Sequence, residues 1–149
     1  MRLLFITIAW PAPGERNLYS DLMEEFTGRG VEVTVLATMP ERGTDGAVMA
    51  GERRKGGVLK AFTMRKERVW VTVEKGIRVL RVLVPPIRKV SSWQKGVSLF
   101  LLTRRMVRAA REHLANARVD LMIAPTPPVT LSPLYRKLKK WSGASFYLL

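Results

Sequence analysis

Cysteine is absent from this 149-residue sequence, and histidine occurs once, at His113. Disulfide frameworks, thiolate metal sites and cysteine nucleophiles are therefore excluded, which fits a reducing cytoplasm. A single imidazole cannot build a zinc site, so we expect no metal ion and interpret His113 as a solvated helix residue.

Acidic residues are scarce: 12 Asp and Glu face 26 Lys and Arg, which gives a formal net charge of +14. Such a charge attracts nucleic acid, anionic lipid headgroups or phosphorylated substrates. No acid/base pair, glycine-rich phosphate loop or nucleophile with a supporting base can be assembled, so the sequence predicts no complete catalytic centre.

Long apolar runs are also missing, because the stretch that begins at Val97 is interrupted by Arg104, short of the roughly 20 residues that span a bilayer. No small-residue cleavage site follows the amino-terminal apolar run, which indicates a buried strand instead of a signal peptide. We expect a cytoplasmic protein whose membrane association, if any, is peripheral and at the inner face.

The elements that are present predict an α/β fold, a Rossmann-like parallel sheet with flanking helices, in one domain spanning 1–149. Leu3–Ile8 and the run from Val31 to Leu36 are expected as parallel strands around a helix capped by Asn17 or Ser20. Residues 38–66 show no sustained period. A tight turn at Lys75 and Gly76 then joins two strands, so we expect an inserted β-hairpin or mobile loop at about 38–75.

The second half predicts a helix from Trp93 to about Ala117, a strand over 120–124, a helix ending at Gly143, and a strand beginning at Ala144. The chain stops inside that last apolar run. We therefore expect the carboxyl terminus to be truncated.

Three segments, in this order, resemble family-four glycosyltransferases of the GT-B fold. They are W-P-A-P-G-E with R-G-V-E-V-T-V-L-A (10–15 and 29–37), G-I-R-V-L-R-V (76–82) and D-L-M-I-A-P-T-P-P (120–128). The chain departs from the family at Val31, where histidine is usual, and at Glu15, where a second glycine is usual.

The resemblance implies that this chain is the amino-terminal, acceptor-side half of a metal-independent, retaining glycosyltransferase. The parent would transfer sugar from a nucleotide-diphospho-sugar to a lipid-linked or polysaccharide acceptor. The donor and its phosphate contacts would belong to a carboxyl-terminal domain that is missing, so this chain would hold no cofactor and would be inactive alone.

Ligands of parallel sheets bind at the carboxyl ends of the strands, which selects the loops after the first strand and after the strand at 120–124. Gly14 would let the backbone approach a ligand, and the first turn of the following helix would offer N–H groups to an anion. The alternative is that proline and glycine merely turn the chain. The expected acceptor-binding residues are Pro13, Gly14, Glu15, Arg16, Asn17, Thr126, Pro127 and Pro128.

Basic residues recur at helical spacing beside a stretch of aromatic and aliphatic residues, a pattern typical of a helix on anionic lipid. The alternative is an ordinary helix whose charges point into water. The expected membrane-surface residues are Trp93, Arg104, Arg108, Arg111, Lys137 and Lys140.

Two other functions stay open at this point. The charge alone suffices for nonspecific nucleic-acid binding, although no helix-turn-helix, zinc or RRM signature is present. A stand-alone Rossmann-like nucleotide binder is the other, although the first loop lacks G-x-G-x-x-G.

Overall fold

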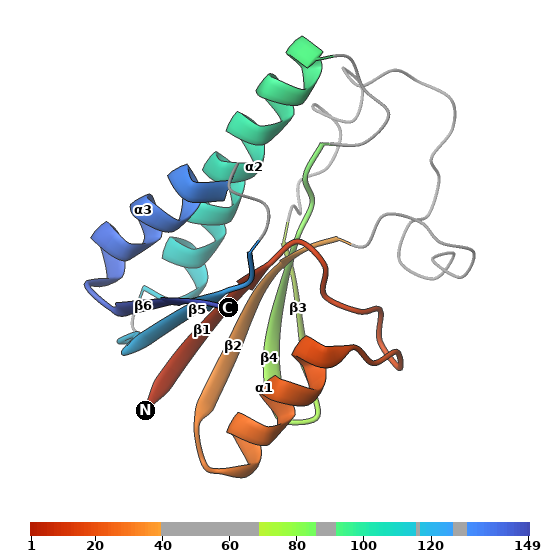
Figure 1. Cartoon of the computed structure of the whole chain (residues 1–149), viewed down its shortest axis with the longest axis vertical. Helices are drawn as coiled ribbons and strands as arrows, with labels where there is room; N and C mark the ends of the chain where they lie inside the picture. Colours follow the sequence, from red (N-terminus) through yellow and green to blue (C-terminus); the bar gives the residue numbers. More distant parts are fainter. Residues whose placement is uncertain (40–68, 86–91, 116, 127–130) are drawn as a thin grey trace.

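The computed structural model describes residues 1–39, 69–85, 92–115, 117–126 and 131–149. These residues form an α/β fold in which three helices flank one six-stranded, mostly parallel sheet (Figure 1). The predicted Rossmann-like class is confirmed. The predicted irregular segment at 38–66 falls, from residue 40 onward, outside the described residues.

The sheet has the strand order β3-β4-β2-β1-β5-β6. Its strands are β1 (Arg2–Thr7), β2 (Glu32–Thr38), β3 (Val69–Glu74), β4 (Ile77–Val82), β5 (Leu121–Ala124) and β6 (Ser145–Leu148). All neighbours pair in parallel except β3 and β4, which are antiparallel. Without β3, the five parallel strands follow the 3-2-1-4-5 order of doubly wound sheets.

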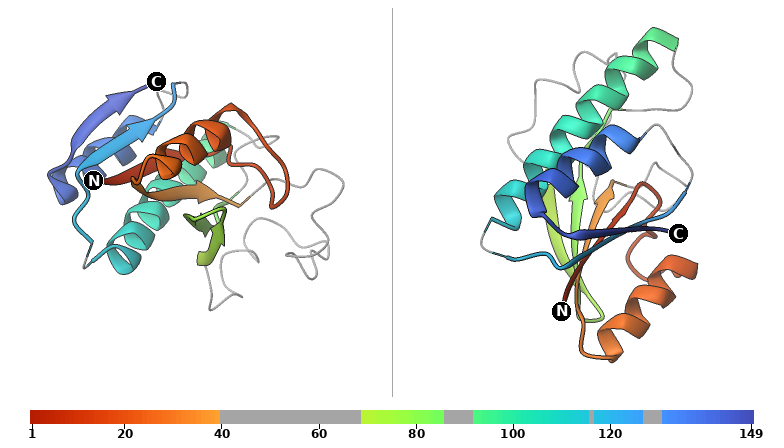
Figure 2. Two further views of the ribbon diagram at one scale, coloured as in Figure 1. Left: turned by 90° about the horizontal axis from the view of Figure 1, so that it is seen from below. Right: turned by 60° about the vertical axis from the view of Figure 1, so that its left-hand side comes forward.

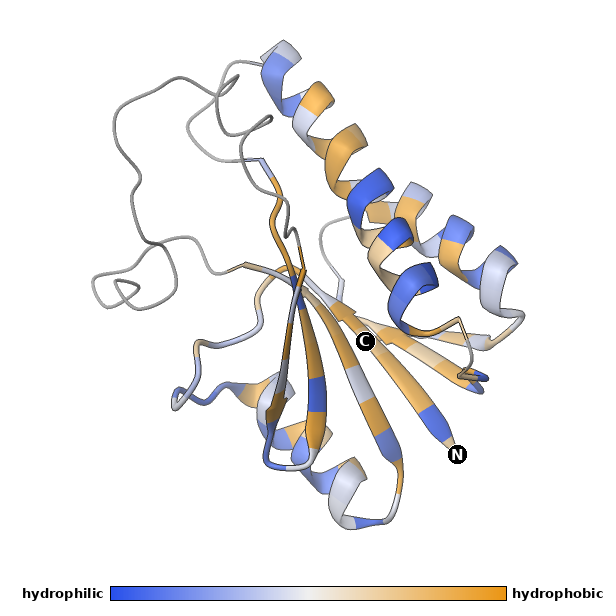
Figure 3. Cartoon of the chain, turned by 180° about the vertical axis from the view of Figure 1, so that it is seen from behind, coloured by the Kyte–Doolittle hydropathy of each residue, from blue (hydrophilic) through white to orange (hydrophobic). Residues whose placement is uncertain are grey.

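Helix α1 (Leu18–Gly28) covers one face of the sheet, and α2 (Ser92–His113) and α3 (Ser132–Ser142) cover the other (Figure 2). Each face has its own core. Phe5 and Met23 are fully buried on the α1 side, and Leu36, Leu80 and Leu102 are fully buried on the α2 and α3 side. The strands are hydrophobic over most of their length because both of their faces are covered (Figure 3).

Local signals in the sequence explain where the elements begin and end. Both predicted caps of the first helix take part in one capping box, in which the Asn17 side chain accepts from the Ser20 amide and Ser20 bonds back to Asn17. Lys75 and Gly76 both have positive φ, 50° and 81°, which the tight hairpin turn requires. Gly143 ends α3 in the left-handed conformation.

The predicted boundaries differ from the structure mainly in α2. The pattern predicted a helix to about Ala117, whereas α2 ends at His113 and one further backbone bond joins Leu114 to Ala110. The chain must then turn back to enter β5. Among the described residues, no helix is long and apolar enough to cross a membrane.

Candidate functional site

The order of the strands reverses at β1. The chain proceeds from β1 to β2 and β4 on one side, and β5 and β6 lie on the other. The helices that follow β1 and β5, α1 and α3, lie on opposite faces of the sheet (Figure 2). In doubly wound sheets, the carboxyl ends of the strands at such a switch point border the ligand-binding crevice.

A small pocket lies at this switch point and has a volume of about 90 Å³. The end of β1 and the start of its loop supply Thr7, Ile8 and Ala9, and β5 leads into it with Pro125. The flanking helices close it from both faces of the sheet, with Tyr19 from α1 and with Leu131 and Tyr135 from the start of α3.

Hydroxyl groups are the polar feature of the pocket lining. The Thr7 Oγ1 accepts a hydrogen bond from the Ala9 amide at 3.1 Å. The Tyr135 hydroxyl is buried without a hydrogen-bond partner among the described residues, and the residue as a whole is only 7% exposed. Burial raises the pKa of Tyr135 to about 12, so its phenol stays protonated at neutral pH and remains a hydrogen-bond donor.

The loop between β1 and α1 is anchored on the far side, over β3 and β4. The Arg81 Nη2 donates to the Pro11 carbonyl at 2.8 Å and to the Glu74 Oε1 at 2.9 Å. The Trp10 indole donates to the other Glu74 oxygen, Oε2, at 3.3 Å. These bonds fix the start of the loop across the end of β2.

Glu74 keeps its charge in this cluster. Burial alone would raise the pKa of Glu74, but hydrogen bonds from Arg81, Thr72 and Trp10 together outweigh burial and lower it below its ordinary value. The Arg81 side chain is 3% exposed, and its Nε and Nη1 have no hydrogen-bond partner within the described part of the chain.

The residues of the first loop that were predicted to bind an acceptor have local structural roles. Pro13 and Gly14, with φ of 92° at Gly14, occupy the positions that a type II turn needs, and the Glu15 amide closes this turn on the Ala12 carbonyl. Arg16 pairs with Asp21 and Glu24. Asn17 caps α1 and also donates to the Ala9 carbonyl. Their contact with an acceptor stays a prediction.

The second predicted loop is described only as far as Thr126. Its amide and hydroxyl both donate to the Leu149 carbonyl oxygen, at 2.9 and 2.8 Å. Pro127 and Pro128 lie outside the described residues. Ala9 and Pro125, near the starts of the two loops, both line the pocket. The exposed residues further along the first loop do not line it; these are Pro13, Gly14, Glu15 and Arg16.

The residues predicted to face a membrane lie on the outer surfaces of α2 and α3. Trp93 is 71% exposed, and Val97 and Phe100 extend the same helical face, at 45% and 61%. The basic residues that follow on this face, Arg104, Arg108 and Arg111, are exposed, as are Lys137 and Lys140 on α3. The amino-terminal turns of α2 extend beyond the sheet at the top of Figure 1.

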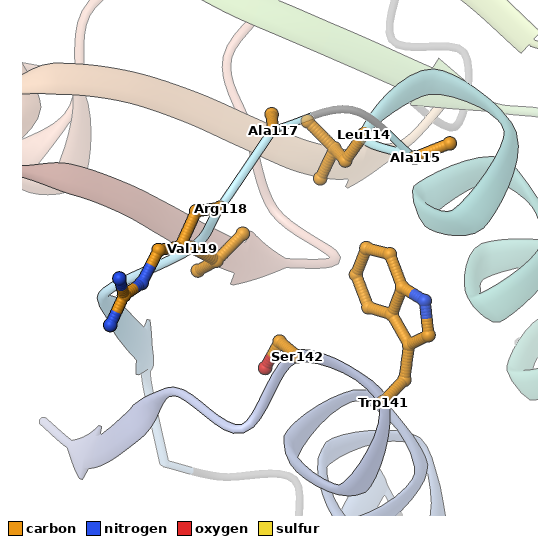
Figure 4. Close-up of a pocket in the computed structure, with 7 residues that line it drawn as sticks. All are labelled: Leu114, Ala115, Ala117, Arg118, Val119, Trp141 and Ser142. Carbon is orange, nitrogen blue, oxygen red and sulfur yellow. The ribbon is translucent and has the colours of Figure 1, made fainter.

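A larger hollow, of about 340 Å³, lies at the opposite edge, between the ends of α2 and α3 (Figure 4). Trp141 faces it, and the Ser142 hydroxyl is already engaged with the Met122 sulfur and the Ala144 amide. It borders the amino ends of β5 and β6, where doubly wound sheets do not bind their ligands. We therefore take the smaller switch-point pocket as the candidate site.

Reasoning from the sequence did not select Thr7, Tyr19, Tyr135 or the Arg81 and Glu74 pair. A signal existed for the two tyrosines, since each falls within the first turns of a helix that follows a strand bordering the crevice. Arg81 was visible as a charged residue within an aliphatic strand. Its pairing with Glu74 could not be predicted, because the hairpin register places Arg81 opposite Trp70 and Glu74 opposite Ile77, so the two are not cross-strand neighbours.

No protein-family model matches this sequence, and no curated protein matches it either. Within the described ranges, no group of three metal-ligating side chains occurs.

Proposed function

We propose that this chain is the acceptor-side domain of a family-four glycosyltransferase of the GT-B fold. The observation that supports this best is the pocket at the switch point. Ala9 and Pro125 line it, at the starts of the two loops, after β1 and after β5, from which acceptor binding is expected. The acceptor would be a sugar carried on a lipid or on a polysaccharide.

In this proposal the nucleotide-sugar belongs to a second α/β domain. The size of the pocket supports this division, because about 90 Å³ is well below the roughly 300 to 1,000 Å³ of pockets that enclose whole small molecules. The pocket has room for one small group of an acceptor. Transfer then requires the donor domain to close over the carboxyl edge of this sheet.

The proposal also gives the chain a membrane-facing surface, formed by the exposed faces of α2 and α3 at the cytoplasmic side. Trp93, Val97 and Phe100 would enter the headgroup region, while Arg104 and Arg111 would contact anionic lipid. A lipid-linked acceptor would reach the site from this surface.

Acceptor binding by the purified chain tests the proposal. We expect a polyprenyl-diphosphate-linked sugar in detergent to bind, measured by calorimetry, and we expect no sugar transfer from nucleotide-sugars by the chain alone. Ala9→Phe should abolish binding by filling the pocket. The matched control is Ala115→Phe, which places the same side chain in the hollow at the opposite edge.

Robust transfer by the chain alone would overturn the proposal, as would tight binding of the nucleotide-sugar in place of the acceptor. Preferential binding of duplex nucleic acid over the acceptor at physiological salt would favour the nucleic-acid alternative.

A further inference from the structure

We propose that the switch-point pocket binds a small oxyanion, such as a phosphate group, through the Tyr135 hydroxyl and the first turn of α3. This inference rests on the proposed function only for the source of the oxyanion, which would be the phosphate of a lipid-linked acceptor.

Tyr135 has unused hydrogen-bonding capacity. Its ring packs against Phe146, with the ring centroids 5.4 Å apart, so the side chain is held in place. Its hydroxyl is buried and finds no partner among the described residues, although the residue lines the pocket. An unsatisfied buried hydroxyl is unfavourable, so a ligand that accepts its hydrogen bond would relieve that cost.

The two helix amino termini near the pocket differ in how they are capped. The amino terminus of α1 is capped by Asn17, and Arg16 beside it is paired with Asp21 and Glu24. In α3 the cap position is Leu131, which provides no side-chain hydrogen bond. Pro133 has no N–H, so the first-turn donors that lack a side-chain cap are the amides of Ser132 and Leu134. Leu131 and Tyr135 both line the pocket, which places this uncapped turn at its wall.

The charges around the pocket are compatible with an anion. No aspartate or glutamate is among the described residues that line the pocket. The positive end of the α3 dipole and three hydroxyl-bearing residues, Thr7, Tyr19 and Tyr135, surround it instead. A neutral or negative group is therefore tolerated, and a group with several acceptor oxygens satisfies more donors than a single sugar hydroxyl does. The volume of about 90 Å³ is enough for one such group.

The test is a titration of the isotope-labelled chain with inorganic phosphate, followed by amide NMR. We expect saturable shifts of the Thr7, Ala9, Leu131 and Leu134 amides. Tyr135→Phe should weaken binding at least tenfold, while the midpoint of thermal unfolding stays the same or rises, because the lost hydroxyl has no partner. The control is Tyr147→Phe, which removes an equivalent hydroxyl from an exposed position on β6 and should bind normally.

A second variant tests phosphate binding without changing a buried side chain. Ser132 is exposed at the start of α3. Ser132→Asp should stabilise the helix through its dipole and still reduce phosphate binding by repulsion. Shifts confined to the basic residues of α2 and α3, or equal binding by Tyr135→Phe, would overturn the inference.

A short-chain polyprenyl phosphate as competitor identifies the source of the oxyanion. Displacement of inorganic phosphate by the lipid, but not by the unphosphorylated alcohol, supports a lipid-linked source. Phosphate binding that the lipid cannot displace contradicts the lipid-linked acceptor of the proposed function and leaves the oxyanion site in place.

Discussion

Glu74 and Arg81 join the hairpin to the loop that enters the candidate site, and the charge of Glu74 is essential to that contact. Without the negative charge of Glu74, the buried Arg81 guanidinium would face only neutral acceptors, such as the Pro11 carbonyl. Removal of one partner of a buried ion pair costs several kcal/mol. Because Glu74 is 23% exposed, we take a value below that range, about 2 kcal/mol.

We therefore expect Glu74→Gln to lower the free energy of unfolding by about 2 kcal/mol at pH 7, measured by urea denaturation. The folded-state pKa of Glu74 is lowered, so its contribution is present above the ordinary value of 4.5 and is lost as the pH falls through the lower folded value. The two proteins should thus converge in stability below pH 4.5. Glu32→Gln, which breaks the exposed pair with Arg2, is the control and should have little effect.

At the scale of single elements, α1 depends on its capping box. Asn17→Ala should lower the free energy of unfolding by about 1 kcal/mol, because the Ser20 amide loses its acceptor. Asn17→Ser retains a capping oxygen and should recover most of that loss. Equal stability of the alanine variant and the wild type would contradict this role for the cap.

The elements were predictable from the sequence because their signals are local. Aliphatic runs predict the strands, and Asn17, Gly76 and Gly143 predict the helix cap, the turn and the helix end.

The candidate site was only partly predictable. The switch-point rule selects the edge at which the small pocket lies, but Tyr135 and Tyr19 both line that pocket only because α3 and α1 pack on opposite faces of the sheet. Whether a hydroxyl group finds a hydrogen-bond partner depends on such packing, which no pattern in the sequence reveals.

At the scale of the whole molecule, charge is distributed unevenly. The ion pairs of α1 engage its carboxylates with Arg16, Arg29 and Lys75. On α2 and α3, several exposed cations form no ion pair with any described residue. These cations are Arg104, Arg111, Arg136, Lys137, Lys139 and Lys140. In Figure 3, hydrophilic positions recur along both of these helices.

This asymmetry predicts which charges control membrane binding. Arg104→Gln with Arg111→Gln should weaken binding to phosphatidylserine-containing vesicles about 30-fold, since each charge near the surface contributes about 1 kcal/mol. The control, Arg2→Gln with Arg29→Gln, removes the same charge at a distance from α2 and α3 and should bind nearly as well as the wild type. Cosedimentation measures both, and equal losses would show that only net charge matters.

The central position of β1 has a consequence for how the chain is synthesised. One edge of β1 pairs with β2, which follows after a single helix, whereas the other edge pairs with β5, and Arg2 and Asp120 are 118 positions apart. During translation, the β5 edge of β1 therefore stays open until the ribosome has released residues 121–124. Contacts between such distant positions slow folding, and an unpaired apolar edge invites wrong pairing while it waits.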